Sequence, residues 1–158
     1  MTSRLARLSM AASVLLLLSA CSATTDAGET PSATGGAIEL AVSETCTDDS
    51  DPQCVSVNGE YVVLPSAFER AGVEDAAVAD IEGQNAVGVT FTDDGAEILH
   101  ALTEQAAGSG SIARLVMKVG DEIQAAVAVM QAIEGNYVQI VLSPDDSAQD
   151  LVGLIQAG

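Results

Sequence analysis

Apolar side chains recur at every second position in several stretches of the chain, and this alternation constrains the fold more than any other feature. It is clearest in residues 87–91, 113–119 and 138–142. Successive side chains of a β-strand point to opposite faces, so a period of two indicates strands with one buried face. Turn-forming residues stand beside these stretches at Gly83–Asn85 and Gly120–Asp121. The pattern therefore predicts antiparallel hairpins.

Two other segments have the period of a helix. Thr92 can cap the first, and Gly108 follows its last turn. Ser143 and Pro144 suit the N-cap and the first helical position of the second. Their apolar faces contain Ile98, Leu99, Leu102 and Ala106 in the first helix and Ala148, Leu151, Val152 and Ile155 in the second. We expect an α+β domain in which an antiparallel sheet of four to six strands carries two helices on one face, with a disordered linker before it.

The N-terminus has the features of a secretory signal that ends at a cysteine. Two arginines precede an apolar run over residues 10–20, which is too short to span a bilayer as a helix. The sequence Leu18–Ser19–Ala20–Cys21 resembles the bacterial lipobox, in which the cysteine thiol accepts lipid. We expect residues 1–20 to be a lipoprotein signal peptide and Cys21 to be acylated, which would anchor the chain to the extracytoplasmic face of the cell membrane. An ordinary signal peptide cleaved elsewhere is the alternative.

Residues 21–36 have the composition of a tether. Ser, Ala, Thr, Gly, Pro and acidic residues make up this segment, without apolar periodicity. A flexible linker of this length separates its ends by roughly 20 Å. We therefore expect residues 21–36 to be a flexible acylated linker and residues 37–158 to be the folded domain.

Cys46 and Cys54 are the cysteines that remain after Cys21. An even pair in an exported protein favours a disulfide. A redox dithiol is disfavoured, because activated pairs usually have the Cys-x-x-Cys spacing beside a helix start. The loop between them contains Asp48, Asp49 and Asp51, whose carboxylates could bind calcium. Without the residue frame of a calcium loop, a solvated acidic loop is the better interpretation.

The chain is strongly acidic. It has 23 Asp and Glu against 5 Lys and Arg, a formal net charge of -18. Such a chain repels nucleic-acid phosphate and anionic headgroups, so binding through counterion release is excluded as its main activity. We expect no nucleic-acid partner, and a domain that stands off the membrane to which its lipid is attached.

The ordered series of elements from Leu64 to the C-terminus resembles the head part of the first large extracytoplasmic domain of SecD, the accessory subunit of the bacterial Sec protein-export machinery. The matching segments are Val87–Phe91, Gly95–Ala96, Leu102–Thr103, Arg114–Ile123, Ile133–Ile140 and Ser143–Gly158. The chain departs from the family at Gln124–Ala126, where a Ser-Ala-Pro-like stretch is common, and no transmembrane helix is expected. The resemblance implies a SecD head-like domain, with its core match over residues 64–158, re-anchored by lipid and detached from the proton-driven transporter.

These observations favour a non-enzymatic binding or accessory module that contacts exported chains, Sec components or another envelope partner. A free sheet edge or the uncovered sheet face could take an extended peptide. A structural or solubilising envelope lipoprotein is the alternative, and a hydrolase is disfavoured. Carboxylate pairs such as Asp93–Asp94 and Asp145–Asp146 stand at helix starts or turns, and His100 is expected near Glu97 and Glu104 as a solvated residue. We therefore expect no catalytic residue, metal or cofactor.

Overall fold

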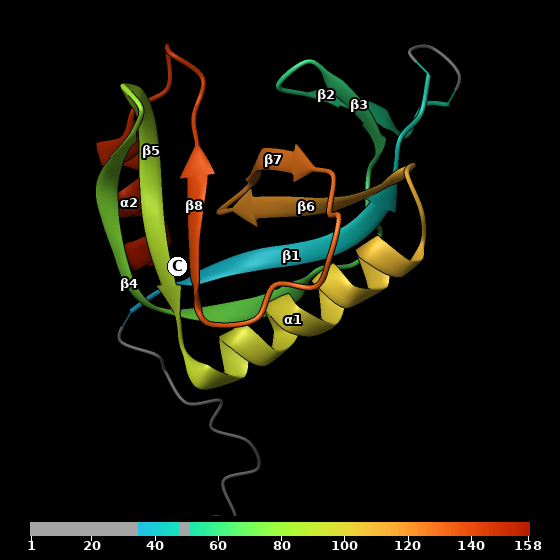
Figure 1. Ribbon diagram of the computed structural model, residues 1–158. Coiled ribbons are helices and arrows are strands. Elements are labelled where there is room, and N and C mark those ends of the chain that lie inside the picture. The colour runs from blue at the N-terminus through green and yellow to red at the C-terminus, as the bar shows by residue number, and fades with distance from the viewer. Residues whose placement is uncertain (1–34, 48–50) are drawn as a thin grey trace, which may run out of the picture. The chain divides into compact units, whose positions relative to one another are not determined.

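The computed structural model describes residues 35–47 and 51–158 of the chain (Figure 1). Within them the elements follow in the order β1 (Ala37–Glu44), β2 (Cys54–Val57), β3 (Glu60–Val63), β4 (Glu69–Ile81), β5 (Gln84–Phe91), α1 (Asp93–Gly108), β6 (Ala113–Val119), β7 (Glu122–Val127), β8 (Tyr137–Val141) and α2 (Ala148–Ala157). The expected α+β class is confirmed. Of the described helices, none combines the length and the hydropathy that crossing a bilayer requires.

Six strands form one curled antiparallel sheet in the order β7-β6-β1-β4-β5-β8. The hairpins β4–β5 and β6–β7 are those that the alternation predicts, and β1 joins them in the middle of the sheet. The strand direction turns strongly across the sheet. In Figure 1 β5 and β8 stand upright, whereas β1, β6 and β7 run across the view. The outer edges of β7 and β8 pair with no further strand of the described residues.

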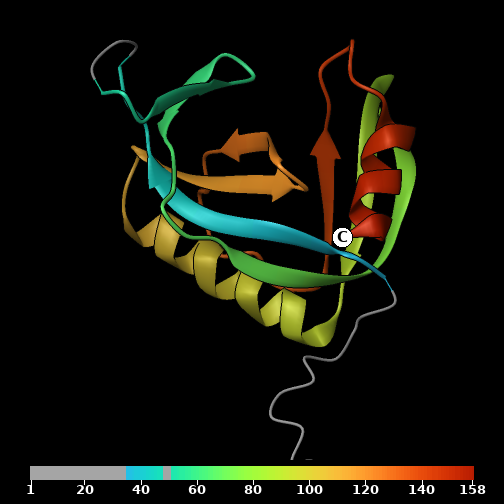
Figure 2. The same cartoon turned by 180° about the vertical axis from the view of Figure 1, so that it is seen from behind.

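Both helices pack on the same face of the sheet and share one core. In Figure 1 α1 runs below β1 and β4, and α2, behind β4 and β5, comes to the front in Figure 2. The largest side chains buried in this core come from every layer: Ile38, Leu40, Phe91, Leu99 and Ile155. Each such side chain contributes about 1.5–3 kcal/mol on burial, so this face of the sheet carries most of the stability.

The first helix begins where the sequence predicts. The hydroxyl of Thr92 accepts a hydrogen bond from the N–H of Gly95 at 3.1 Å and so satisfies one of the free amides of the first turn. Gly95 lies against β4, and a Cβ placed there would be 2.3 Å from the carbonyl oxygen of Gly72. A residue without a side chain is therefore required for the helix to approach the sheet this closely.

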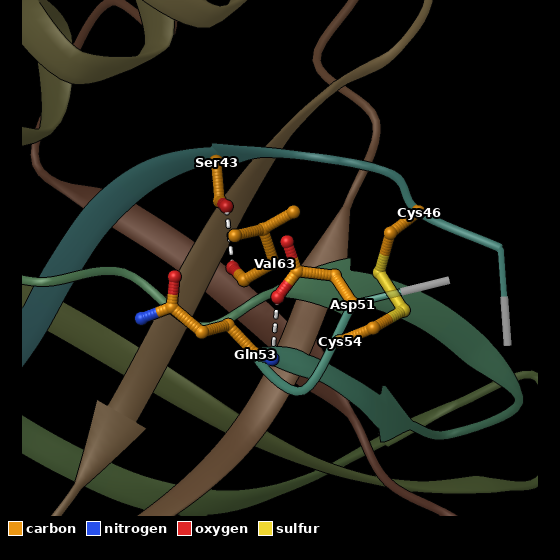
Figure 3. Close-up of a disulfide and its surroundings, with 6 residues drawn as sticks. All are labelled: Ser43, Cys46, Asp51, Gln53, Cys54 and Val63. Carbon is orange, nitrogen blue, oxygen red and sulfur yellow. Dashed lines mark hydrogen bonds between the residues drawn. A yellow bond between two sulfur atoms is a disulfide. The ribbon is translucent and has the colours of Figure 1, made fainter. Parts of the chain in front are cut away.

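A separate two-stranded sheet, β2–β3, packs on the opposite face of the large sheet. Its Val57 and Val62 bury the side chain of Val116 from β6 in a small second core. Cys46, just after β1, forms a disulfide with Cys54 at the start of β2, with a Cα–Cα distance of 6.0 Å (Figure 3). The disulfide thus ties the β2–β3 hairpin to the end of the central strand.

Two predicted boundaries are wrong. The second helix begins at Ala148 with Ser147 as its N-cap, not at Ser143, because residues 143–146 form a turn in which the N–H of Asp146 donates to the carbonyl of Ser143. The apolar run Ile123–Met130 follows the Gly120–Asp121 turn and is predicted as the second strand of that hairpin, but the strand ends at Val127. Residues 128–136 continue without regular structure toward β8.

Candidate functional site

The outer edge of β8 presents unpaired main-chain groups. The N–H of Leu142 donates to the carbonyl of Asn85, and the carbonyl of Asn136 accepts from the N–H of Phe91. These two bonds show that the even-numbered residues of β8 direct their main-chain groups toward β5. Alternate residues of an antiparallel strand direct their amides to opposite sides. The main-chain groups of Tyr137, Gln139 and Val141 therefore point away from β5, and no partner for them is found among the described residues.

An apolar hollow of about 350 Å³ lies beside this edge. It is bounded by the core-facing residues of β6 and β7, by β8, by α1 and by the segment that joins β7 to β8. Its lining is Leu99, Leu115, Met117, Ala125, Val127, Ala128, Val129, Met130, Gln131, Ile133, Val138, Gln139, Ile140 and Val141. Two glutamines are the polar members of this set. A ligand of the apolar hollow would gain contact with aliphatic and thioether groups, and its polar partners would be main-chain atoms.

Residues 128–136, here called the strap, lie along α1 and close one side of the apolar hollow (Figure 1). The hydroxyl of Thr103, fully buried in α1, accepts from the N–H of Ile133 at 2.9 Å and donates to the carbonyl of Leu99 at 2.8 Å. Nδ1 of His100 is 3.1 Å from the carbonyl oxygen of Ile133, which can accept a hydrogen bond from it. One residue of the strap is therefore held at both its main-chain groups.

The rim of the apolar hollow exposes large apolar side chains. Met130 of the strap is 90% exposed, and Val127 and Val141 are 40% and 45% exposed on either side of the opening. Grouped apolar residues in water mark binding surfaces more often than scattered ones do. This rim and the free edge of β8 are adjacent, so one partner can contact both.

A second hollow of about 210 Å³, the acidic hollow, lies between the start of β7 and the start of α2. Its charged residues are Glu122, Asp146 and Asp150, and Leu151 and Leu154 of α2 form part of its wall. Within the described residues these three carboxylates form no ion pair and no side-chain hydrogen bond. The apolar hollow and the acidic hollow together are called the β7–β8 groove below.

The arginines and the lysine of the described domain are all engaged elsewhere. Arg114 pairs with Glu60 at 2.7 Å, Lys118 pairs with Glu39 at 2.6 Å, and Arg70 donates to the main-chain oxygen of Gly158. The partners of these cations are thus on β1, on β3 and at Gly158, after α2. None of the described arginines and lysines lines the acidic hollow.

The structure tests some of the predicted site residues. The disulfide between Cys46 and Cys54 is present, and Asp51 in its loop accepts a hydrogen bond from the N–H of Gln53 at 2.8 Å (Figure 3). The predicted lipid attachment at Cys21, the signal peptide, nearly all of the linker, and the acids Asp48 and Asp49 lie outside the described residues. In the part that is described, no cluster of three or more His, Cys, Asp and Glu could hold a metal ion.

The surroundings of His100 differ from the prediction. The imidazole is exposed, as expected, but its Nδ1 contacts the carbonyl of Ile133 on the strap, a partner outside its own helix that was not predicted. The sequence did not identify Thr103 or the strap as part of a site. The one signal it offered was the apolar stretch 125–130, which has too many apolar residues in succession for a strand with one solvated face.

Comparisons with known proteins give the fold. No protein-family model matches the chain, and no curated protein matches it. A solved structure of SecDF, a membrane component that enhances protein export, matches with a TM-score of 0.55 and 19% identity, over 78% of this chain and 64% of that chain. A crystal structure of SecDF in a super-membrane-facing form matches with a TM-score of 0.52 and 19% identity, over 77% of this chain and 19% of that one. The described domain therefore has a SecDF-like fold, and the chain spans less than two thirds of either SecDF chain.

Proposed function

We propose that the chain is a non-enzymatic accessory protein, anchored by lipid on Cys21 to the extracytoplasmic face of the cell membrane, whose domain binds extended segments of exported polypeptides. The observation that carries the binding role is the apolar hollow beside the unpaired edge of β8. An extended segment can add to a free edge through main-chain hydrogen bonds and place alternate side chains in an adjoining hollow. Main-chain hydrogen bonds do not depend on the side chains of the partner, so this mode of binding suits a protein that contacts many different exported chains.

The SecDF-like fold supports the link to export, because SecDF is described as enhancing that process. A fold does not carry a function with it, so the proposal takes from SecDF the class of partner and not the activity of the whole protein. Exported polypeptides are the partner proposed for the groove. Components of the Sec machinery are the proposed neighbours at the membrane, and nucleic acid is not a partner of so acidic a chain.

The lining of the apolar hollow supports binding over catalysis. Its described residues are aliphatic side chains, two methionines and two glutamines, which offer no acid, base or nucleophile to a substrate. The carboxylates of the acidic hollow pair with no cation or histidine of the described domain. The site is thus suited to holding a segment and releasing it unchanged.

The first experiment measures binding of a fluorescent extended peptide of alternating Thr and Val to the full chain. Gln139→Pro removes an outward-facing amide of β8 and leaves the hydrogen bonds to β5 in place, since proline is tolerated at a free edge. We expect the dissociation constant to rise by about tenfold, from one lost hydrogen bond and the obstruction by the ring. Gln139→Thr is the matched control, because it changes the same side chain and keeps the amide. Equal binding by both variants would contradict strand addition at β8.

The second experiment tests the export partner in cells. A photo-crosslinking residue at position 141 lies at the groove, and one at position 78 lies on β4 with similar exposure, 45% against 52% for the native valines. We expect crosslinks to exported polypeptides from position 141 and few from position 78. Equal recovery from both positions, or recovery from neither, would favour a structural envelope protein.

A further inference from the structure

The apolar hollow and the acidic hollow follow each other along both edge strands of the sheet. Along β7, Glu122–Gln124 line the acidic hollow, and Ala125 and Val127 line the apolar hollow. Along the other edge, Val138–Val141 line the apolar hollow and Leu142, the next residue, lines the acidic hollow. A segment that pairs with β8 along its length therefore passes from one hollow to the other.

The acidic hollow offers three exposed carboxylates to a bound segment. Glu122, Asp146 and Asp150 have no ion pair among the described residues, and the described arginines and lysine are bonded on other parts of the sheet. A Lys or Arg side chain that enters the hollow is attracted by each of these carboxylates. The acidic hollow is thus complementary to a basic side chain of a bound segment.

Antiparallel pairing with β8 decides which of the two features comes first along the partner. Every strand pair of the large sheet is antiparallel, and β8 runs from the apolar hollow at Val138 toward the acidic hollow at Leu142. When a segment pairs antiparallel with β8, its N-terminal end lies beside Leu142 and its C-terminal end lies beside Val138. Its first residues then lie at the carboxylates and the following residues at the apolar hollow.

We infer that the β7–β8 groove selects extended segments in which Lys or Arg comes first and apolar residues at alternate positions follow. This inference rests on the proposed function and adds the chemical class of the segment and its direction of binding. The spacing of the two features along the partner is set by the four-residue separation of Leu142 and Val138. Apolar contacts and main-chain hydrogen bonds hold the segment, and the carboxylates determine the direction in which it binds.

Three labelled octapeptides test the inference with the full chain. One has two lysines followed by three Thr-Val pairs, the second has the same residues with the lysines at the C-terminal end, and the third has glutamines in place of the leading lysines. We expect the first to bind about five- to tenfold more tightly than the other two at low salt, because each exposed charge interaction is modest. The advantage should nearly vanish at about 1 M salt, where the screening length falls to roughly 3 Å.

Two triple variants show whether the effect is local. Glu122→Gln with Asp146→Asn and Asp150→Asn removes the charges of the acidic hollow. The control, Glu69→Gln with Glu74→Gln and Asp75→Asn, removes three exposed charges on β4 and changes the net charge equally. We expect the first variant to bind all three octapeptides with equal affinity and the control to keep the preference. The unfolding midpoint of each variant confirms that the domain is intact.

Each contrary result refutes a different statement. Equal binding of the first two octapeptides would overturn the direction, and loss of the preference in the β4 control would overturn the acidic hollow as its source. If all three bind the unaltered chain equally and Gln139→Pro still weakens them, the inference fails and the proposed function stands. If none of the octapeptides binds, the proposed function itself fails.

Discussion

The buried hydroxyl of Thr103 should control how firmly the strap lies over the apolar hollow. Its side chain is fully buried, and it links the carbonyl of Leu99 in α1 to the N–H of Ile133 in the strap. Thr103→Val keeps the shape of the side chain and the β-branching, and it removes the hydroxyl. The helix keeps its own hydrogen bonds, whereas the strap loses a main-chain anchor.

The cost follows from which group is left without a partner. A buried N–H without a hydrogen bond costs about 1–3 kcal/mol. Ile133 is half-buried, so its N–H can regain water when the strap lifts, and we expect a loss of about 1–2 kcal/mol. This corresponds to an increase of about 5- to 30-fold in the population in which the strap is open.

Hydrogen exchange at the amide of Ile133 measures that population, and urea unfolding followed by circular dichroism measures the global stability. Thr103→Ser is the control, since it keeps the hydroxyl and loses one methyl group, worth about 0.8 kcal/mol. The serine variant should lose global stability without faster exchange at Ile133. Unchanged exchange in Thr103→Val, or equally faster exchange in both variants, would refute the anchoring role of the hydroxyl.

Three further predictions concern other parts of the chain. Gly95→Ala should lower the free energy of unfolding by about 1–3 kcal/mol, because the added Cβ would contact β4. Gly153→Ala should raise it by about 0.5–1 kcal/mol, because a Cβ there has no atom within 4 Å and alanine favours the helix. Urea titration measures both changes. Replacing Cys46 and Cys54 together by Ser should lower the same quantity by about 2–3 kcal/mol, and an equal effect of reductant on the native chain checks the cause. Cys21→Ala should abolish labelling with palmitate and move the protein out of the membrane fraction; labelling that persists contradicts acylation there.

Most of the sheet could be predicted from the sequence, because its hairpins bury one face and therefore alternate clearly. The central strand β1 could not. Ala37, Ile38, Leu40 and Ala41 are all buried, on both faces of the strand, so their sequence reads as a short apolar run without a period. A strand that is covered on both faces thus lacks the alternation by which the hairpin strands were predicted.

The start of α2 shows how tertiary contacts decide between equal local signals. Ser143 is followed three residues later by Asp146, and Ser147 is followed three residues later by Asp150, so each serine has the same capping pattern. The side-chain amide of Asn85 donates to the carbonyl of Asp146, which holds the earlier segment as a turn at the end of the β4–β5 hairpin. The helix is left to begin at the later serine.

The candidate groove lies beyond what the sequence can give. The groove exists because the curled sheet brings its first and last strands, β7 and β8, to the two sides of one opening, and local patterns carry no information on that curvature. The anchoring of the strap depends on a hydrogen bond between Thr103 and Ile133, which are 30 residues apart. Either residue alone looks like an ordinary member of its segment.

A free strand edge beside exposed apolar residues normally invites association with another copy of the same chain. Here the formal net charge of -18 opposes that outcome, because two copies meeting at the groove would bring their unpaired carboxylates together. The same charge attracts a segment that carries Lys or Arg, so repulsion between copies and preference for a basic partner have one cause. On the proposed function, the charge that keeps other copies of the chain away from the edge of β8 also leaves that edge available for a foreign segment.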